Sequence, residues 1–158
     1  MSILNILKQI LILLFIAMLP GCNFEVKHDG FKDLTRLQRT GYSNDWLVCP
    51  PGTCNEGKKI EIPIFLNNLE DLIRTTQKIF NQQPRTKFVS SVPELNQLIF
   101  IQRSKIFGFP DTIWVQFLIL EKGISLAMYS RSNYGYYDFG VNRRRLNTWI
   151  EELKKAVK

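Results

Sequence analysis

The residues best suited to chemistry gather in one stretch near the C-terminus. Between Ser130 and Arg145 the chain carries hydroxyl groups, a carboxylate, amides and four arginines. Guanidinium groups bind phosphates and carboxylates through paired hydrogen bonds, and the free N–H groups at a helix start attract anions as well. The pattern predicts a candidate site for an anionic ligand, formed by Ser130, Arg131, Ser132, Asp138, Asn142, Arg143, Arg144 and Arg145.

A structural role is the alternative for the same residues. The three arginines at 143–145 fall in the first turn of a predicted helix, where cations oppose the helix dipole. Successive residues point to different sides of a helix, so at most two of them can face one site. Asp138 and other carboxylates can instead pair with the arginines and brace the turn that leads into the helix. The sequence leaves both interpretations open.

Residues for covalent or metal chemistry are scarce. The only histidine is His28, which precedes the predicted domain, so a Ser–His or Cys–His dyad cannot form within it. No Gly-rich phosphate loop and no metal-ligand spacing is present. We therefore expect a non-catalytic protein with no metal and no cofactor, and a hydrolase or transferase is the less favoured alternative.

Cys22 follows a ten-residue apolar run at 10–19 and ends the segment Leu-Pro-Gly-Cys. Such a run is short for a membrane-spanning helix, which needs about 20 apolar residues, and is typical of a secretory signal. A leucine three positions before the cysteine and a small residue directly before it resemble the lipobox of bacterial lipoproteins. The resemblance implies a signal peptide over residues 1–21 and lipidation of Cys22. An uncleaved membrane anchor or a buried core helix is the alternative.

The lipobox resemblance also implies a location. Proteins of this type carry a diacylglyceryl thioether and usually an amide-linked acyl chain such as palmitate, and two or more chains anchor a protein stably. Asn23 stands where aspartate commonly retains Gram-negative lipoproteins in the inner membrane, so we expect the periplasmic face of the outer membrane. The expected partners are the membrane, through the lipid anchor, and an anionic small molecule or envelope protein. Nucleic acid is not expected despite the net charge of +7.

Lipidation of Cys22 leaves Cys49 and Cys54 as a pair. The intervening Pro-Pro-Gly-Thr favours a tight reversal, which can bring two Cα atoms to the separation that a disulfide needs. The periplasm permits such bonds. Two thiols and a distant histidine are too few ligands for zinc, and the spacing is not the C-x-x-C of redox-active pairs. We predict a structural disulfide between Cys49 and Cys54.

The remaining pattern predicts one α+β domain over residues 46–158, preceded by a lipidated tether over residues 22–45 with little apolar periodicity. A short edge strand is expected at 59–64, where Pro63 interrupts the ladder. A helix capped by Asn67 or Asn68 ends before Pro84. Four strands and a last helix follow, at 86–92, 97–105, 112–120, 124–131 and 141–156.

The expected order is thus β-α-β-β-β-β-α, a curved antiparallel sheet of about four to five strands with two helices packed on it. Glycine in the pair Lys122-Gly123 favours a tight hairpin between the last two strands. The third of the four central strands is apolar on both faces, since Val115 and Phe117 point one way and Trp114 and Leu118 the other. Either both faces are covered, or one lines an apolar cavity or contacts a partner.

The run at 138–145, Asp-Phe-Gly-Val-Asn-Arg-Arg-Arg, after the Ser-Arg-Ser segment at 130–132, resembles domain-of-unknown-function family 1499 (DUF1499). The similarity extends upstream through 107–111 and 89–91 and covers roughly residues 44–156. The family tends to carry two cysteines near the domain start, which Cys49 and Cys54 match in part, while the residues around Cys54 depart from its pattern. The resemblance implies an exported or envelope protein and brings no established catalytic residues.

The expected function is therefore that of a non-catalytic envelope lipoprotein, which binds an anionic or lipid-like ligand or a protein partner. The alternative is a structural or assembly factor of the outer membrane with no small ligand.

Overall fold

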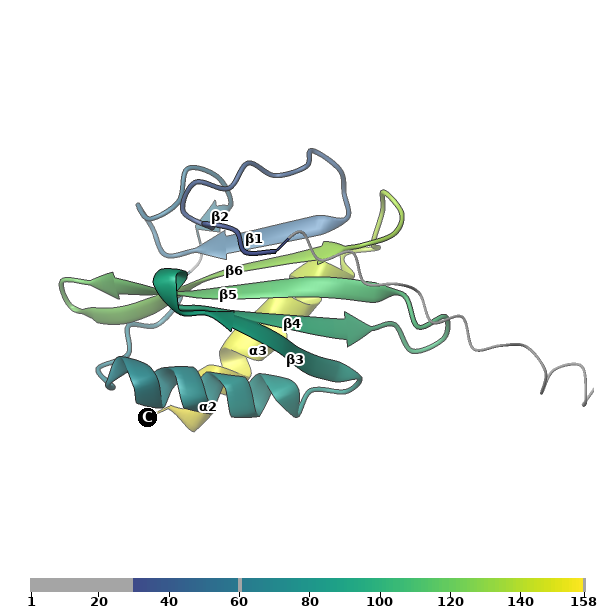
Figure 1. Cartoon of the computed structure of the whole chain (residues 1–158). Coiled ribbons are helices and arrows are strands. Elements are labelled where there is room, and N and C mark those ends of the chain that lie inside the picture. The colour runs from purple at the N-terminus through teal and green to yellow at the C-terminus, as the bar shows by residue number, and fades with distance from the viewer. Residues whose placement is uncertain (1–29, 60, 158) are drawn as a thin grey trace, which may run out of the picture.

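The structure is a computed structural model and describes residues 30–59 and 61–157 (Figure 1). Across the sheet the strands lie in the order β2-β1-β6-β5-β4-β3, and neighbours are antiparallel except for β1 and β2. The predicted α+β class and element order are confirmed, with the additional strand β1 in front. The elements are β1 (Asp45–Cys49), β2 (Lys58–Lys59), α2 (Leu69–Asn81), β3 (Thr86–Val92), a 3₁₀ turn (Pro93–Leu95), β4 (Gln97–Arg103), β5 (Pro110–Leu120), β6 (Gly123–Ser132) and α3 (Val141–Ala156).

The strand expected at 59–64 is wrong in its extent. Only its first residue belongs to β2, which pairs in parallel with β1 over two residues. Residues 61–64 form no strand, and the chain rejoins the sheet at Phe65, which makes an isolated bridge with Ile124. Pro63 has no N–H to donate to a ladder, although its carbonyl oxygen accepts a hydrogen bond from Ser125. The alternation of apolar residues there therefore reflects partial burial without strand pairing.

The helix α2 begins as the sequence predicts. The side chain of Asn68 accepts hydrogen bonds from the backbone N–H groups of Glu70 and Asp71, which otherwise lack partners at a helix start. Leu72, Thr76 and Phe80 recur every four residues and are buried against the sheet. The cap and the helical periodicity together place α2 on the face where α3 also packs.

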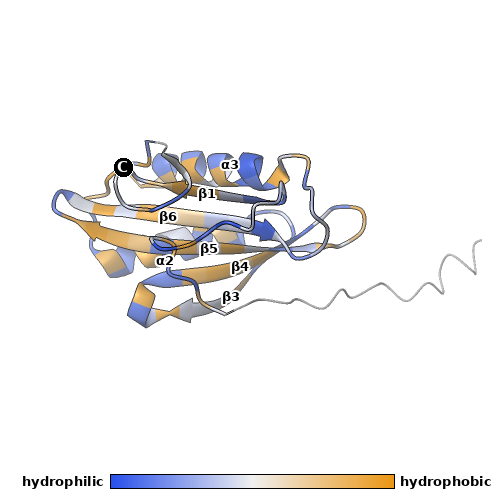
Figure 2. Cartoon of the chain, turned by 90° about the horizontal axis from the view of Figure 1, so that it is seen from above, coloured by the Kyte–Doolittle hydropathy of each residue, from blue (hydrophilic) through white to orange (hydrophobic). Residues whose placement is uncertain are grey.

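The hairpin between β5 and β6 is confirmed, and its turn depends on glycine. Leu120 pairs with Gly123, and Gly123 has a φ of 135°. A Cβ at this position would lie 2.6 Å from the carbonyl oxygen of Phe65, closer than real contacts allow. Only glycine thus permits both the turn and the approach of residue 65. Figure 2 shows the long strands of the sheet coloured mainly as hydrophobic.

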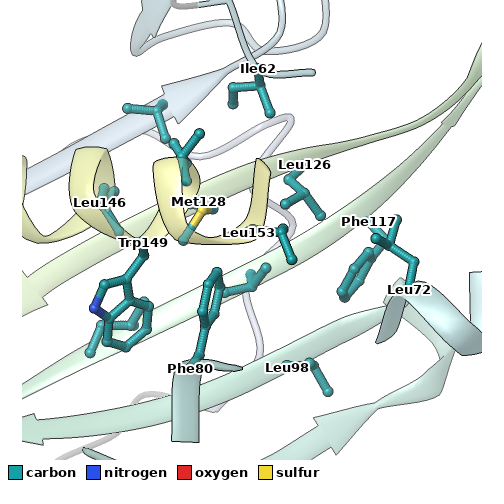
Figure 3. Close-up of a cluster of buried hydrophobic side chains, with 14 of the residues drawn as sticks. Ile62, Leu72, Phe80, Leu98, Phe117, Leu126, Met128, Leu146, Trp149 and Leu153 are labelled. Carbon is teal, nitrogen blue, oxygen red and sulfur yellow. The ribbon is translucent and has the colours of Figure 1, made fainter. Parts of the chain in front are cut away.

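The face of the sheet under α2 and α3 carries the main core (Figure 3). The Trp149 ring lies 4.7 Å from that of Phe80 and 5.9 Å from that of Phe100, measured between centroids. Leu146 and Leu153 of α3 are fully or almost fully buried beside them. These side chains fill the space between the sheet and α3. An apolar ligand cavity, one of the alternatives that the sequence left open for the faces of the sheet, is therefore not formed in this layer. A ligand site therefore has to be sought outside this layer.

The opposite face of the sheet is covered by residues 30–44, which we call the strap. Leu34 is fully buried there, and its backbone N–H donates to the side chain of Gln116 over 2.7 Å. The indole N–H of Trp114 donates to the carbonyl oxygen of Gly30 over 2.8 Å. The strap packs on a second apolar cluster that consists of Leu34, Leu47, Cys49, Ile99, Trp114, Ala127 and Tyr129.

The strap changes two expectations. Residues 30–45 belong to the folded domain, whereas the sequence predicted a tether over 22–45; residues 22–29 lie outside the described residues. Both faces of the sheet are covered, which is the first of the alternatives left open. The reason is that the outer face is too apolar to stay in water, while side-chain amides such as Gln116 satisfy backbone groups of the irregular strap.

The predicted disulfide between Cys49 and Cys54 is present, with Cα atoms 6.1 Å apart. The loop between them turns tightly, since the hydroxyl of Thr53 donates to the carbonyl oxygen of Pro50 over 2.8 Å. Cys49 is buried in the outer cluster, and Cys54 packs against that cluster. The bond therefore fixes the loop after β1 to the outer face of the sheet, a structural role.

Candidate functional site

Arg145 is the centre of a buried polar network. Its Nη2 donates to the Asp111 carboxylate over 2.5 Å, and its Nε donates to the side-chain oxygen of Gln102, also over 2.5 Å. Its Nη1 donates to the Ser130 hydroxyl over 2.8 Å and to the side-chain oxygen of Asn142. The Arg145 side chain is only 5% exposed. The network joins α3 to β4, β5 and β6, so Arg145 braces the fold and is closed to a soluble ligand.

Asp138 caps the start of α3 instead of forming the predicted ion pair with the arginines. Its carboxylate accepts hydrogen bonds from the backbone N–H groups of Gly140 and Asn142, over 2.7 and 2.8 Å. A negative charge at this end of α3 is favourable for the helix dipole, which offsets the unfavourable arginines of the first turn. The same contacts occupy donors that an external anion would need. The carboxylate that pairs with an arginine of the run is Asp111.

The alternation of β6 separates the other candidate residues. Ser130 and Ser132 lie on the α3 side, where Asn142 donates to the Ser132 hydroxyl over 3.3 Å. Arg131 lies on the other face, opposite Asp45 of β1. Arg131 therefore cannot share a site with the two serines that flank it, and the eight predicted residues do not form one cluster.

Arg143 and Arg144 are both exposed, but their surroundings differ. Arg144 donates from Nη1 to the carbonyl oxygen of Phe139 over 2.9 Å. The guanidinium carbon of Arg143 lies 5.7 Å from the centre of the Trp46 ring, a cation–π contact. Within the described part of the chain, Arg143 has no ion pair with a carboxylate. Its contact with Trp46 uses no N–H group, so the guanidinium N–H groups of Arg143 are available to a ligand.

A surface pocket of about 550 Å³ lies beside Arg143, between the strap and the turn into α3. We call it the edge pocket. Its lining combines the indole of Trp46 and the rings of Tyr42 and Tyr137 with the guanidinium groups of Arg39 and Arg143. Arg39 also lies 5.7 Å from the Trp46 ring. The two arginines therefore flank one aromatic surface.

Asp45 fixes the strap side of the edge pocket. Its buried carboxylate accepts from Nε of Arg39 over 2.8 Å, from the Thr40 hydroxyl over 3.0 Å and from the Tyr129 hydroxyl over 2.9 Å. Burial, and then the nearby Asp45 charge, raise the pKa of Tyr129, so that its hydroxyl remains a donor. Arg39 is committed to this contact, and Arg143 is the lining cation with free donor capacity.

Sequence reasoning named Asp138 and Arg143 but missed the other side of the edge pocket. Trp46, Arg39 and Tyr42 come from the strap and β1, about 100 residues earlier in the chain. No motif links them to the arginine run. The isolated bridge between Ser43 and Tyr137 brings the two segments together, and such a pairing leaves no local trace in sequence.

The lining of the edge pocket has the chemical groups that recognise an anion. Aromatic rings beside a cation with available N–H donors favour a carboxylate or phosphate attached to a flat or apolar group. Among residues 30–59 and 61–157, no group of three or more His, Cys, Asp or Glu side chains is placed to hold a metal ion. The same residues contain no helix long and apolar enough to cross a membrane.

The structure is thus an antiparallel α+β domain with a surface pocket that is lined by aromatic rings and arginines. The family model described as "Protein of unknown function (DUF1499)" matches residues 51–153, and the chain belongs to this family. The matched range runs from the disulfide loop into α3 and includes Asp138 and Arg143, while the strap and β1 precede it. A search of the curated proteins found no significant match to the chain.

Proposed function

We propose that the protein is an exported envelope lipoprotein that binds an anionic ligand in the edge pocket without catalysing a reaction. The observation that carries this proposal is the state of Arg143. Arg145 pairs with Asp111, Arg39 pairs with Asp45, and Arg144 bonds to the backbone. Arg143 faces the pocket through its contact with Trp46, which uses no N–H donor.

A ligand with a carboxylate or phosphate fits this arrangement best. The anionic group can accept charge-assisted hydrogen bonds from Arg143, which are stronger than those between neutral groups. The apolar or flat remainder can lie on Trp46 and Tyr42, at the strap side of the pocket. Three carboxylates also line the pocket. Those of Asp45 and Asp138 accept several hydrogen bonds each, and that of Glu56 accepts one from the backbone N–H of Arg39, which reduces their repulsion of a bound anion.

Native mass spectrometry of the protein purified from its own envelope tests the ligand. We expect a co-purified small anion on the wild-type protein and its loss from Arg143→Gln. Loss of one charge-assisted hydrogen bond of about 1.5–3 kcal/mol corresponds to roughly a ten- to hundredfold lower affinity. Arg144→Gln is the matched control, because it removes the same charge at the next position and should keep the ligand. A wild-type protein without a bound small molecule would contradict the proposal.

The lipid anchor is proposed from Leu19-Pro20-Gly21-Cys22 after the apolar run, and outer-membrane sorting from Asn23. Cys22→Ser is expected to abolish acylation and to block cleavage of the signal, because the thiol is the acceptor of the lipid. Mass spectrometry of the membrane and soluble fractions measures both effects. Cys49→Ser controls for loss of a cysteine as such. An unchanged mass increment from acyl chains in Cys22→Ser would refute lipidation at this residue.

A structural or assembly role in the outer membrane is the second candidate. The filled layer between the sheet and the helices and the Arg145 network favour it, since most of the arginine run is used for the fold. Absence of a co-purified small molecule, together with a stable protein partner, would support this role over ligand binding. Hydrolase or transferase activity has less support, because the domain has no histidine to form a nucleophile–base dyad.

A further inference from the structure

The loop between β4 and β5 forms an apolar projection at one end of the sheet. We call residues 104–109 the loop tip. Ile106 is 83% exposed and Phe107 66% exposed. The Phe107 ring lies 5.6 Å from that of Phe109, which in turn lies 6.2 Å from the Tyr134 ring. Figure 2 shows hydrophobic colour at this end of the sheet. Clustered apolar side chains of this kind mark interaction surfaces.

Basic residues border the loop tip. A pocket of about 870 Å³ beside it is lined by Arg85, Lys87, Arg103 and Lys105, and its lining contains no aspartate or glutamate. Nη1 of Arg103 donates to the carbonyl oxygen of Gly108, which ties the loop to the pocket. The combination matches an anionic bilayer surface. Aromatic and aliphatic side chains can enter the boundary of the acyl chains, while lysine and arginine remain at the lipid phosphates.

The strap runs toward the end of the sheet that carries the loop tip. Leu34 is bonded to Gln116 and Gly30 to Trp114, so the strap, followed toward its N-terminal end, runs along β5 toward Pro110. Pro110 directly follows the loop tip. Cys22 precedes Gly30 by eight residues, which span at most about 28 Å. An anchor at Cys22 can therefore hold the domain with its loop tip at the membrane.

We propose that the loop tip and its basic pocket dock on the surface of an anionic lipid bilayer and orient the anchored domain. The orientation rests on the proposed lipid anchor, whereas the contact of the loop tip with lipid is measured separately. The β5–β6 hairpin at the other end of β5 serves as an internal reference. Ile119 is 69% exposed there, roughly 30 Å from the start of the strand.

Quenching of an introduced indole by brominated lipids tests the contact. The full chain is reconstituted into vesicles with phosphatidylglycerol or with phosphatidylcholine alone, and the signal of the wild-type tryptophans is subtracted. In phosphatidylglycerol vesicles we expect strong quenching for Phe107→Trp and none above background for Ile119→Trp. Phosphatidylcholine alone should weaken the quenching for Phe107→Trp.

Charge variants separate electrostatic docking from random collision. Each lysine near an anionic surface strengthens binding about fivefold. Adding Lys87→Gln and Lys105→Gln to the Phe107→Trp variant is therefore expected to lower the equilibrium ratio of membrane-bound to unbound loop tip roughly 25-fold. Lys78→Gln with Lys155→Gln is the matched control, because both lysines are exposed on the helices. It changes net charge equally and should leave the quenching as it was.

Three outcomes overturn the docking proposal. The first is equal quenching for Phe107→Trp and Ile119→Trp, and the second is no response to phosphatidylglycerol. The third is protection of the Phe107→Trp indole from acrylamide quenching before vesicles are added. If this protection increases with protein concentration, the loop tip binds a second copy of the chain instead of a bilayer. If mass spectrometry finds no acyl chain on the protein and the quenching persists, the proposed lipid anchor is wrong and the docking surface is still supported.

Discussion

Arg145→Ala is expected to lower the free energy of unfolding by about 3–5 kcal/mol, the range found when one partner of a buried ion pair is removed. The substitution leaves the Asp111 carboxylate without its cation and removes the donor shared by Gln102, Ser130 and Asn142. Buried acceptors that lose their donors retain the desolvation cost. Urea unfolding followed by the fluorescence of the buried tryptophans measures the change.

Arg144→Ala is the control for Arg145→Ala. It removes the same group one position earlier in α3, where the side chain is exposed and bonds only to the carbonyl oxygen of Phe139 among the described contacts. We expect a loss within about 0.5 kcal/mol, as for most surface substitutions. The double variant with Asp111→Ala should cost less than the sum of the two single variants, because they remove one shared interaction. Equal losses for Arg144→Ala and Arg145→Ala would contradict the buried network.

Asp45→Ala is expected to have the second-largest effect, near the lower end of the same range of about 3–5 kcal/mol. The Asp45 side chain is fully buried, while its partner Arg39 keeps 28% exposure and can regain water. The change also leaves the buried hydroxyl of Tyr129 without its acceptor. Urea unfolding again measures the loss, with Asp71→Ala as the control. Asp71 is 54% exposed in its pair with Arg74, and such surface pairs contribute about 0–1 kcal/mol.

The same variant also reports on the edge pocket. Without Asp45, Arg39 and Thr40 lose the contacts that hold the strap side of the pocket, so binding of the anion should weaken although Arg143 is unchanged. Asp45→Asn keeps the shape and one acceptor oxygen but removes the charge, and we expect an intermediate effect on both stability and binding. Asp45→Asn with wild-type stability would show that the charge of Asp45 does not matter.

Much of the fold follows from patterns among near neighbours in the sequence. The periodicity of α2, its Asn68 cap and the glycine turn at Gly123 each depend on residues at most four positions apart. The disulfide between Cys49 and Cys54 likewise closes a short local loop. The strand expected at 59–64 failed because alternation records burial, and it cannot tell a paired strand from a segment such as 61–64 that only packs.

The sequence by itself determined the α+β class, the order of the elements, the disulfide and the stretch of chain that holds the arginines. Tertiary structure alone decided which arginine is buried and which faces a pocket. Residues two positions apart on a helix point about 200° apart, to nearly opposite sides, so Arg143 and Arg145 meet different neighbours, Trp46 on one side and Asp111 on the other. Those neighbours lie 97 and 34 residues away and are brought close only by the pairing of β1, β6 and β5.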